Sequence, residues 1–87
     1  MTVYYSGRVQ GVGFRYTVKS LTPGFEVTGT IRNLEDGRVE LVVLGERAEL
    51  DAFRQAVRDS GLGRMIKSEE EFFAQPTGNF RGFEIVR

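Results

Sequence analysis

The 87-residue chain contains no cysteine and no histidine, and these two absences exclude several kinds of chemistry. Without Cys it cannot form a disulfide framework, a redox CxxC pair or a thiolate nucleophile, and without His it lacks the commonest metal ligand and general base. Twelve basic and twelve acidic side chains give zero net charge, which argues against a strongly basic nucleic-acid-binding module. Any catalysis must use other groups, and ten of the twelve cations are Arg, which favours bidentate binding of carboxylate or phosphate.

Long hydrophobic runs are lacking as well. The longest apolar stretch, Leu41 to Leu44, is far too short to span a bilayer. The segment from Met1 to Arg8 has no basic lead and no cleavage site of small residues, so we expect no targeting signal and a cytoplasmic location. The length predicts one compact domain over residues 1–87, which buries roughly 60 to 65% of its unfolded surface and acts most simply as a monomer.

Hydrophobic periodicity divides the chain into strands and helices. Period-two alternation or β-prone composition predicts strands over Thr2–Val9, Phe25–Asn33, Arg38–Leu44, Met65–Phe73 and Gly82–Arg87. Helical spacing of apolar residues predicts helices over Phe14–Leu21 and Glu46–Ser60, with Gly61 as a C-terminal cap. Asp36-Gly37 is typical of a hairpin turn, and residues 75–79 are typical of a surface loop.

This order predicts an α+β, ferredoxin-like split β-α-β sandwich. We expect an antiparallel sheet of four to five strands with two helices on one face, in the order β-α-β-β-α-β followed by a C-terminal return. The fold supports binding, regulation and catalysis, so it does not identify a function.

The most informative stretch runs from Ser6 to Arg15, where a strand passes through three glycines into a helix whose second residue is Arg15. Glycines let successive N–H groups turn inward, the helix N-terminus adds unpaired donors, and an Arg fork adds charge-assisted hydrogen bonds, so the segment can hold a tetrahedral oxyanion. The alternative is a plain strand-to-helix turn, with Arg15 paired to a surface acid. The Walker A and dinucleotide patterns do not fit, and a thiol phosphatase loop would need Cys where Val9 stands.

The stretch Gly7-Arg8-Val9-Gln10-Gly11-Val12-Gly13-Phe14-Arg15, followed by Gly29-Thr30-Ile31-Arg32-Asn33, resembles the acylphosphatase family over essentially the whole chain. The resemblance implies a small hydrolase of carboxyl-phosphate mixed anhydrides. It implies that Arg15 binds the phosphate and that Asn33 orients the attacking water. Thr30, where an aromatic residue is frequent in the family, and Pro23, at the end of the first helix, depart from the family pattern without touching these groups.

The position and chemistry of Asn33 also fit the orientation of a water, independently of the resemblance. It shares the parity of Ile31 and Val27, so it points to the helix-covered face at a strand end. Its amide can hold a water in a fixed direction but cannot take its proton. The alternative is that Asn33 only starts the hairpin turn.

We therefore expect direct attack of water on the phosphate of an acyl phosphate. Arg15 and the backbone N–H groups of Gln10, Gly11, Val12, Gly13, Phe14 and Arg15 would bind the phosphate, and the proton would leave through the substrate's own oxygens. We expect no cofactor, no metal, no nucleic acid and no membrane partner, with inorganic phosphate or sulfate as product or inhibitor.

Two alternatives of another class stay open. One is a non-catalytic ferredoxin-like domain that binds an anion or regulates; the joint presence of Arg15 and Asn33 argues against it. The other is an RNA-recognition domain, but the strand Arg38–Leu44 has no aromatic residue for base stacking. The acidic run Glu69-Glu70-Glu71 predicts a solvated edge strand rather than a metal site, because consecutive strand residues alternate faces.

Overall fold

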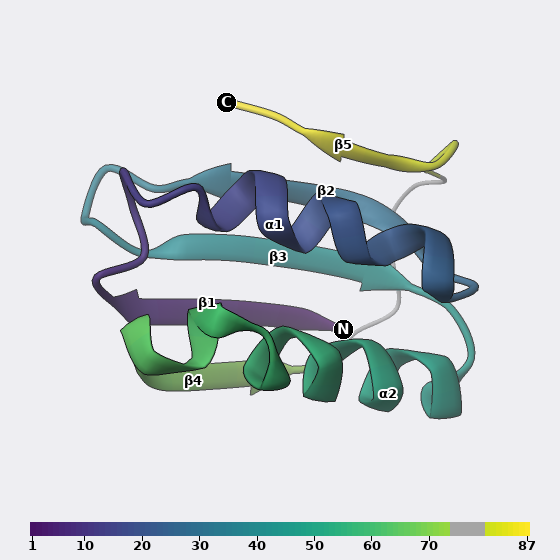
Figure 1. Cartoon of the computed structure of the whole chain (residues 1–87). Coiled ribbons are helices and arrows are strands. Elements are labelled where there is room, and N and C mark those ends of the chain that lie inside the picture. Colours follow the sequence, from purple (N-terminus) through teal and green to yellow (C-terminus); the bar gives the residue numbers. More distant parts are fainter. Residues whose placement is uncertain (74–79) are drawn as a thin grey trace.

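The computed structural model describes residues 1–73 and 80–87, which form five strands and two α-helices (Figure 1). The strands are β1 (Thr2–Gly7), β2 (Thr28–Asn33), β3 (Val39–Leu44), β4 (Ile66–Phe72) and β5 (Phe83–Ile85). The α-helices are α1 (Phe14–Leu21) and α2 (Arg47–Asp59), each followed by a 3-10 turn, η1 (Thr22–Gly24) and η2 (Gly61–Met65). The predicted order of elements is confirmed.

The five strands form one sheet in the order β4-β1-β3-β2-β5. Neighbouring strands are antiparallel except at one edge, where β5 pairs parallel with β2. The expectation of a wholly antiparallel sheet is therefore wrong at this edge. The physical reason is direction: β4 runs opposite to β1 and hence opposite to β2, so a chain that turns back after β4 runs the same way as β2.

Both α-helices cover the same face of the sheet, as predicted (Figure 1). Alternate strand residues and the apolar stripe of each helix meet between the two layers. These residues make up most of the buried core, which comprises Met1, Val3, Tyr5, Val9, Phe14, Val18, Val27, Ile31, Val39, Leu41, Val43, Leu50, Phe53, Val57, Leu62 and Phe83. Hydrophobic burial between the sheet and the helices thus holds both ends of the chain in one layered unit.

All five strands are shorter than expected, and two of the changed boundaries have a cause in specific contacts. The first strand ends at Gly7 rather than Val9, because the N–H of Arg8 donates to the carbonyl of Met65 and the chain leaves the sheet. The second strand begins at Thr28 rather than Phe25. There the N–H of Phe25 closes the η1 turn on Thr22, and the N–H of Glu26 donates to the Glu49 carboxylate on α2. In both places a contact distant in sequence replaces a sheet hydrogen bond.

The segment between β1 and α1 and the turn between β2 and β3 lie at the same end of the sheet (Figure 1). The chain end that follows β5 lies there too, since β5 runs parallel to β2. This end brings together the glycine-rich segment and the residue that ends β2. No helix of the described residues is long and apolar enough to cross a membrane. The loop predicted over residues 75–79 lies outside the described residues.

Candidate functional site

The glycine-rich loop between β1 and α1, residues 8–13, adopts a backbone that only glycine takes readily at two positions. Gly11 has a φ of 76° and Gly13 a φ of 77°, both in the left-handed region. Neither position has another atom within 4 Å of where a Cβ would stand, so it is the backbone conformation and not crowding that calls for glycine. Left-handed residues between right-handed ones turn successive N–H groups toward one side, which is the geometry of an anion-binding nest.

Helix α1 begins directly after this loop with unsatisfied donors. Gly13 is its N-cap, and among the described residues no side chain caps the helix. The carbonyl of Gly13 accepts from the N–H of Thr17 at 3.0 Å, so the first helical turn is formed. Its leading N–H groups therefore remain available for an anion, with the positive end of the helix dipole behind them.

Arg15 is the second residue of α1 and is held in place by its neighbour. Phe14 is 1% exposed and its ring lies 5.2 Å from that of Tyr5, which fixes the start of the helix on the core. The Arg15 side chain is half-buried and forms no ion pair with any described carboxylate. The interpretation of Arg15 as a partner of a surface acid thus has no support in the described part of the chain.

Gln10 ties the loop to the turn between β2 and β3. Its side-chain Nε2 donates to the carbonyls of Leu34 and Arg38, at 2.8 and 2.9 Å. The sequence motif predicted only its backbone N–H as a phosphate ligand, and this structural use of the side chain was missed. A local pattern could not have found it, because Leu34 and Arg38 lie more than twenty residues away.

The turn after Asn33 is closed by its own residues. The N–H of Leu34 donates to the carbonyl of Arg38 at 2.8 Å, and Asp36 accepts from both the N–H and the Nε of Arg38, at 3.0 and 2.8 Å. The backbone N–H of Arg38, followed by its side chain, holds the pKa of Asp36 below the usual value. None of these hydrogen bonds of the turn involves the Asn33 side chain.

Asn33 is the last residue of β2, opposite Val39 in the register, on the side of the sheet that Ile31 also faces. Its side-chain oxygen Oδ1 is buried and accepts no hydrogen bond from the described residues. A buried amide oxygen without a donor is costly unless a water or ligand fills the gap. The Asn33 oxygen is therefore a hydrogen-bond acceptor without a partner among the described residues. The uncapped start of α1, at the same end of the molecule, offers several backbone N–H donors.

The loop also borders a hollow of about 560 Å³ lined by Arg8, Gln10, Val12, Arg64 and Met65. Arg64 and Met65 belong to η2, which the sequence analysis did not predict. The N–H of Arg8 donates to the carbonyl of Met65 at 2.9 Å, so the loop and η2 are joined directly. Only tertiary packing brings Arg64 beside the loop, because no motif links the two segments.

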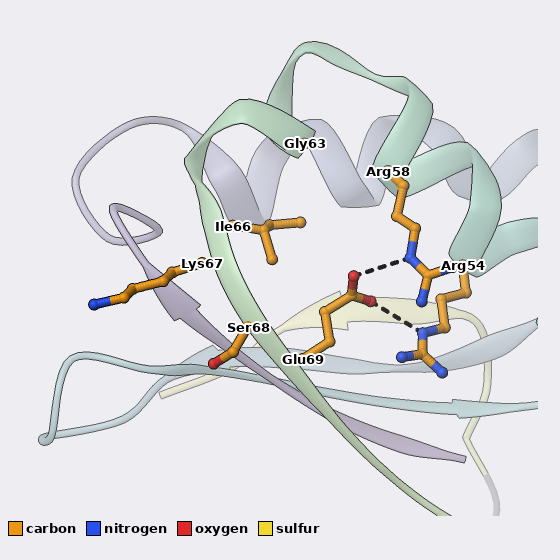
Figure 2. A pocket seen from close by; sticks show the side chains of 7 residues that line it. All are labelled: Arg54, Arg58, Gly63, Ile66, Lys67, Ser68 and Glu69. Atoms are coloured by element: carbon orange, nitrogen blue, oxygen red, sulfur yellow. Dashed lines mark hydrogen bonds and ion pairs between the residues drawn. The ribbon is translucent and has the colours of Figure 1, made fainter.

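A second hollow of about 570 Å³ lies between α2, η2 and β4 (Figure 2). There Glu69 points to two arginines of α2 and accepts from Nε of Arg54 at 3.0 Å and of Arg58 at 2.9 Å. Arg54 also pairs with Glu71 at 2.7 Å. As predicted, β4 is an edge strand and Glu70 and Glu71 are exposed, but the prediction of a solvated acidic run is wrong for Glu69, whose side chain is 15% exposed and binds α2 on the helix-covered face.

The core beneath this ionic cluster contains a second unpartnered polar atom. The hydroxyl of Tyr5 is buried and has no hydrogen-bond partner among the described residues. Burial, and then the nearby Glu69 carboxylate, raises the pKa of Tyr5 far above its ordinary value. The raised pKa keeps the Tyr5 side chain neutral at physiological pH.

No cluster of three or more acidic side chains within residues 1–73 and 80–87 could hold a metal ion. The groups at the loop end are an Arg, an Asn amide and backbone N–H donors. Such a set suits a phosphate or another oxyanion held by hydrogen bonds rather than by a cation.

Comparison with known proteins agrees with this geometry. The sequence model of the acylphosphatase family matches residues 1–85. An acylphosphatase of Listeria monocytogenes is 43% identical over 82 residues, covering 93% of this chain and 88% of the relative. One of Acaryochloris marina is 38% identical over 86 residues, covering 94% of this chain and 87% of the relative. The crystal structure of acylphosphatase from Bacillus subtilis superposes with a TM-score of 0.87 at 30% identity, covering 99% of this chain and 96% of that one. The chain therefore belongs to the acylphosphatase family of hydrolases, as its loop motif indicated.

Proposed function

We propose that this protein hydrolyses the carboxyl-phosphate bond of acyl phosphates, releasing a carboxylate and inorganic phosphate. The phosphate is held in the loop by the N–H groups of Gln10, Gly11, Val12, Gly13, Phe14 and Arg15 and by the Arg15 guanidinium. The left-handed glycines and the uncapped start of α1 support this placement, because they leave donors facing an anion.

Asn33 orients the attacking water through its side-chain oxygen. The observation on which the proposal chiefly rests is that this oxygen is buried and has no hydrogen-bond partner among the described residues, whereas Gln10 and Asp36 make hydrogen bonds in the adjacent turn. A water between Asn33 and the phosphate would satisfy the oxygen and be directed by it.

The reaction needs no strong base. The water oxygen forms a bond to phosphorus while the bond from phosphorus to the acyl oxygen breaks, and its electron pair leaves with the carboxylate. Because phosphoryl transfer is loose, charge stabilisation by Arg15 and the N–H groups lowers the barrier most. The proton of the water passes to a phosphate oxygen of the substrate, since Asn cannot accept it.

The direct test is hydrolysis of benzoyl phosphate, with phenyl phosphate as the monoester control. We expect turnover of the first only, because an ester has a much poorer leaving group. Inorganic phosphate should inhibit competitively, and EDTA should leave the rate unchanged. A folded protein that binds phosphate but hydrolyses neither compound would instead be an anion-binding domain without catalysis.

A further inference from the structure

The hollow beside the glycine-rich loop is large enough for a small organic group. Its volume of about 560 Å³ lies within the range of small-molecule pockets, which is roughly 300 to 1,000 Å³. Three of its lining residues, Arg8, Gln10 and Val12, belong to the glycine-rich loop, and the backbone N–H groups of Gln10 and Val12 are among those for which we propose phosphate binding. A substrate seated with its phosphate in the loop therefore has this hollow beside it.

Backbone contacts fix the distance between the glycine-rich loop and the opposite wall of the hollow, which η2 contributes. The N–H of Arg8 donates to the carbonyl of Met65 at 2.9 Å. Gly7 packs so closely on the backbone of Met65 and Lys67 that a Cβ there would overlap both. Arg8 and Arg64 thus face one hollow from two segments that the backbone locks together.

Neither arginine has an acidic partner in the described part of the chain. By contrast, Arg54 and Arg58 on α2 already form ion pairs with Glu69 and Glu71. Two uncompensated guanidinium groups beside one hollow create a positive potential that favours an anion.

The rest of the lining is partly apolar. Val12 is 41% exposed, and Met65 is half-buried in the wall that η2 contributes. A ligand that suits this lining has a short apolar body with a negative group at its far end. We infer that the preferred substrates are acyl phosphates whose acyl part carries a second negative charge, bound by Arg8 and Arg64. The inference rests on the proposed acyl phosphate hydrolysis.

The test compares two substrates that differ in one charge, 4-carboxybenzoyl phosphate and its neutral analogue 4-carbamoylbenzoyl phosphate. The wild-type protein should show a kcat/KM roughly five- to tenfold higher for the carboxylate, as expected for two partly exposed charge contacts. Arg8→Gln and Arg64→Gln should each reduce this preference through the KM of the charged substrate. Arg64→Gln, which lies in η2 outside the glycine-rich loop, should leave the neutral reaction unchanged. The double variant should abolish it.

Lys19→Gln is the matched control, because it removes one exposed positive charge in the last turn of α1, away from the loop. It should leave the substrate preference intact. Equal kcat/KM for the two substrates in the wild type, or an equal loss of preference in Lys19→Gln, would overturn the second anion subsite. Hydrolysis of the neutral analogue in the same assay would still support the proposed function, whereas failure to hydrolyse either substrate would overturn the proposed function itself.

Discussion

Arg15 and Asn33 offer different help to a phosphoryl transfer. Arg15 is a permanent cation at the start of α1 without a described acidic partner, so it can bind the phosphate before and during the reaction. Asn33 is neutral and offers a buried oxygen that has no partner in the described part of the chain, so it can direct a water without adding charge. At the residue scale, replacing Arg15 and replacing Asn33 should therefore change the kinetic constants in different ways.

Arg15→Ala should lower kcat/KM for benzoyl phosphate by roughly 10³-fold and abolish inhibition by phosphate, because a charge-assisted fork is lost. Asn33→Ala should lower kcat by about 10² with little change in KM, because the water and not the phosphate loses its contact. Steady-state kinetics with phosphate inhibition constants distinguish the two outcomes. Full kcat in a folded Asn33→Ala protein would rule out water orientation by this residue.

Tyr5 gives a residue-scale prediction about stability. Its hydroxyl is buried without a described partner, and burying such a group without a hydrogen bond is unfavourable. Tyr5→Phe keeps the ring that packs on Phe14 and removes the hydroxyl. The free energy of unfolding in urea should therefore rise by about 1 kcal/mol. A decrease would contradict the prediction and would indicate a hydrogen-bond partner, such as a buried water.

Among the elements, β4 depends on α2 as well as on its single strand neighbour. It lies at one edge of the sheet and, among the described strands, pairs only with β1. Arg54 reaches from α2 to Glu69 and Glu71, and the side chains of Arg54 and Glu69 are only 13% and 15% exposed. This cluster fixes the edge strand against the helix that covers it.

Arg54→Ala should lower the free energy of unfolding by about 2 kcal/mol, because it removes the charged hydrogen bonds to Glu69 and Glu71 while Glu69 keeps its bond to Arg58. Asp51→Ala is the control, since its exposed pair with Arg47 one helical turn away is worth only about 0.5 kcal/mol. Urea denaturation of both variants measures the difference. Similar losses in the two would show that the cluster does no more than an ordinary surface pair.

At the scale of the whole molecule, the expected pH dependence follows from the composition. No side chain of the proposed site is of a type that changes charge near neutrality. The chain has no His and no Cys, and the proposed site consists of a guanidinium, an amide and backbone N–H groups. The burial-raised pKa of Tyr5 removes that group from the titration range as well.

The value of kcat should therefore show no protein-derived step between about pH 5 and 8. The check is a pH series with benzoyl phosphate, in which the titration of the substrate's own phosphate is measured in parallel. A step in kcat that follows neither the substrate nor unfolding of the protein would point to a catalytic acid or base outside the proposed site.

Much of the fold follows from short-range pattern. Alternation placed the strands, helical spacing placed α1 and α2, and Asp36-Gly37 placed the hairpin. The largest boundary error occurs where a distant group takes over a backbone hydrogen bond, because Glu49 of α2 accepts from Glu26 and delays the start of β2. The 3-10 turn η2 was missed for a different reason, because its short segment has no periodicity of its own.

The sequence by itself determined the glycine spacing of the loop, the position of Arg15 on the first turn of α1 and the position of Asn33 at the end of β2. These depend on backbone preferences that act over a few residues. Only the tertiary structure decided that Gln10 ties the loop to Leu34, that Arg54 takes up the acids of β4, and that Arg64 lies beside Arg8. Such contacts join residues far apart in the chain, and they form only when the sheet and helices pack on a common core.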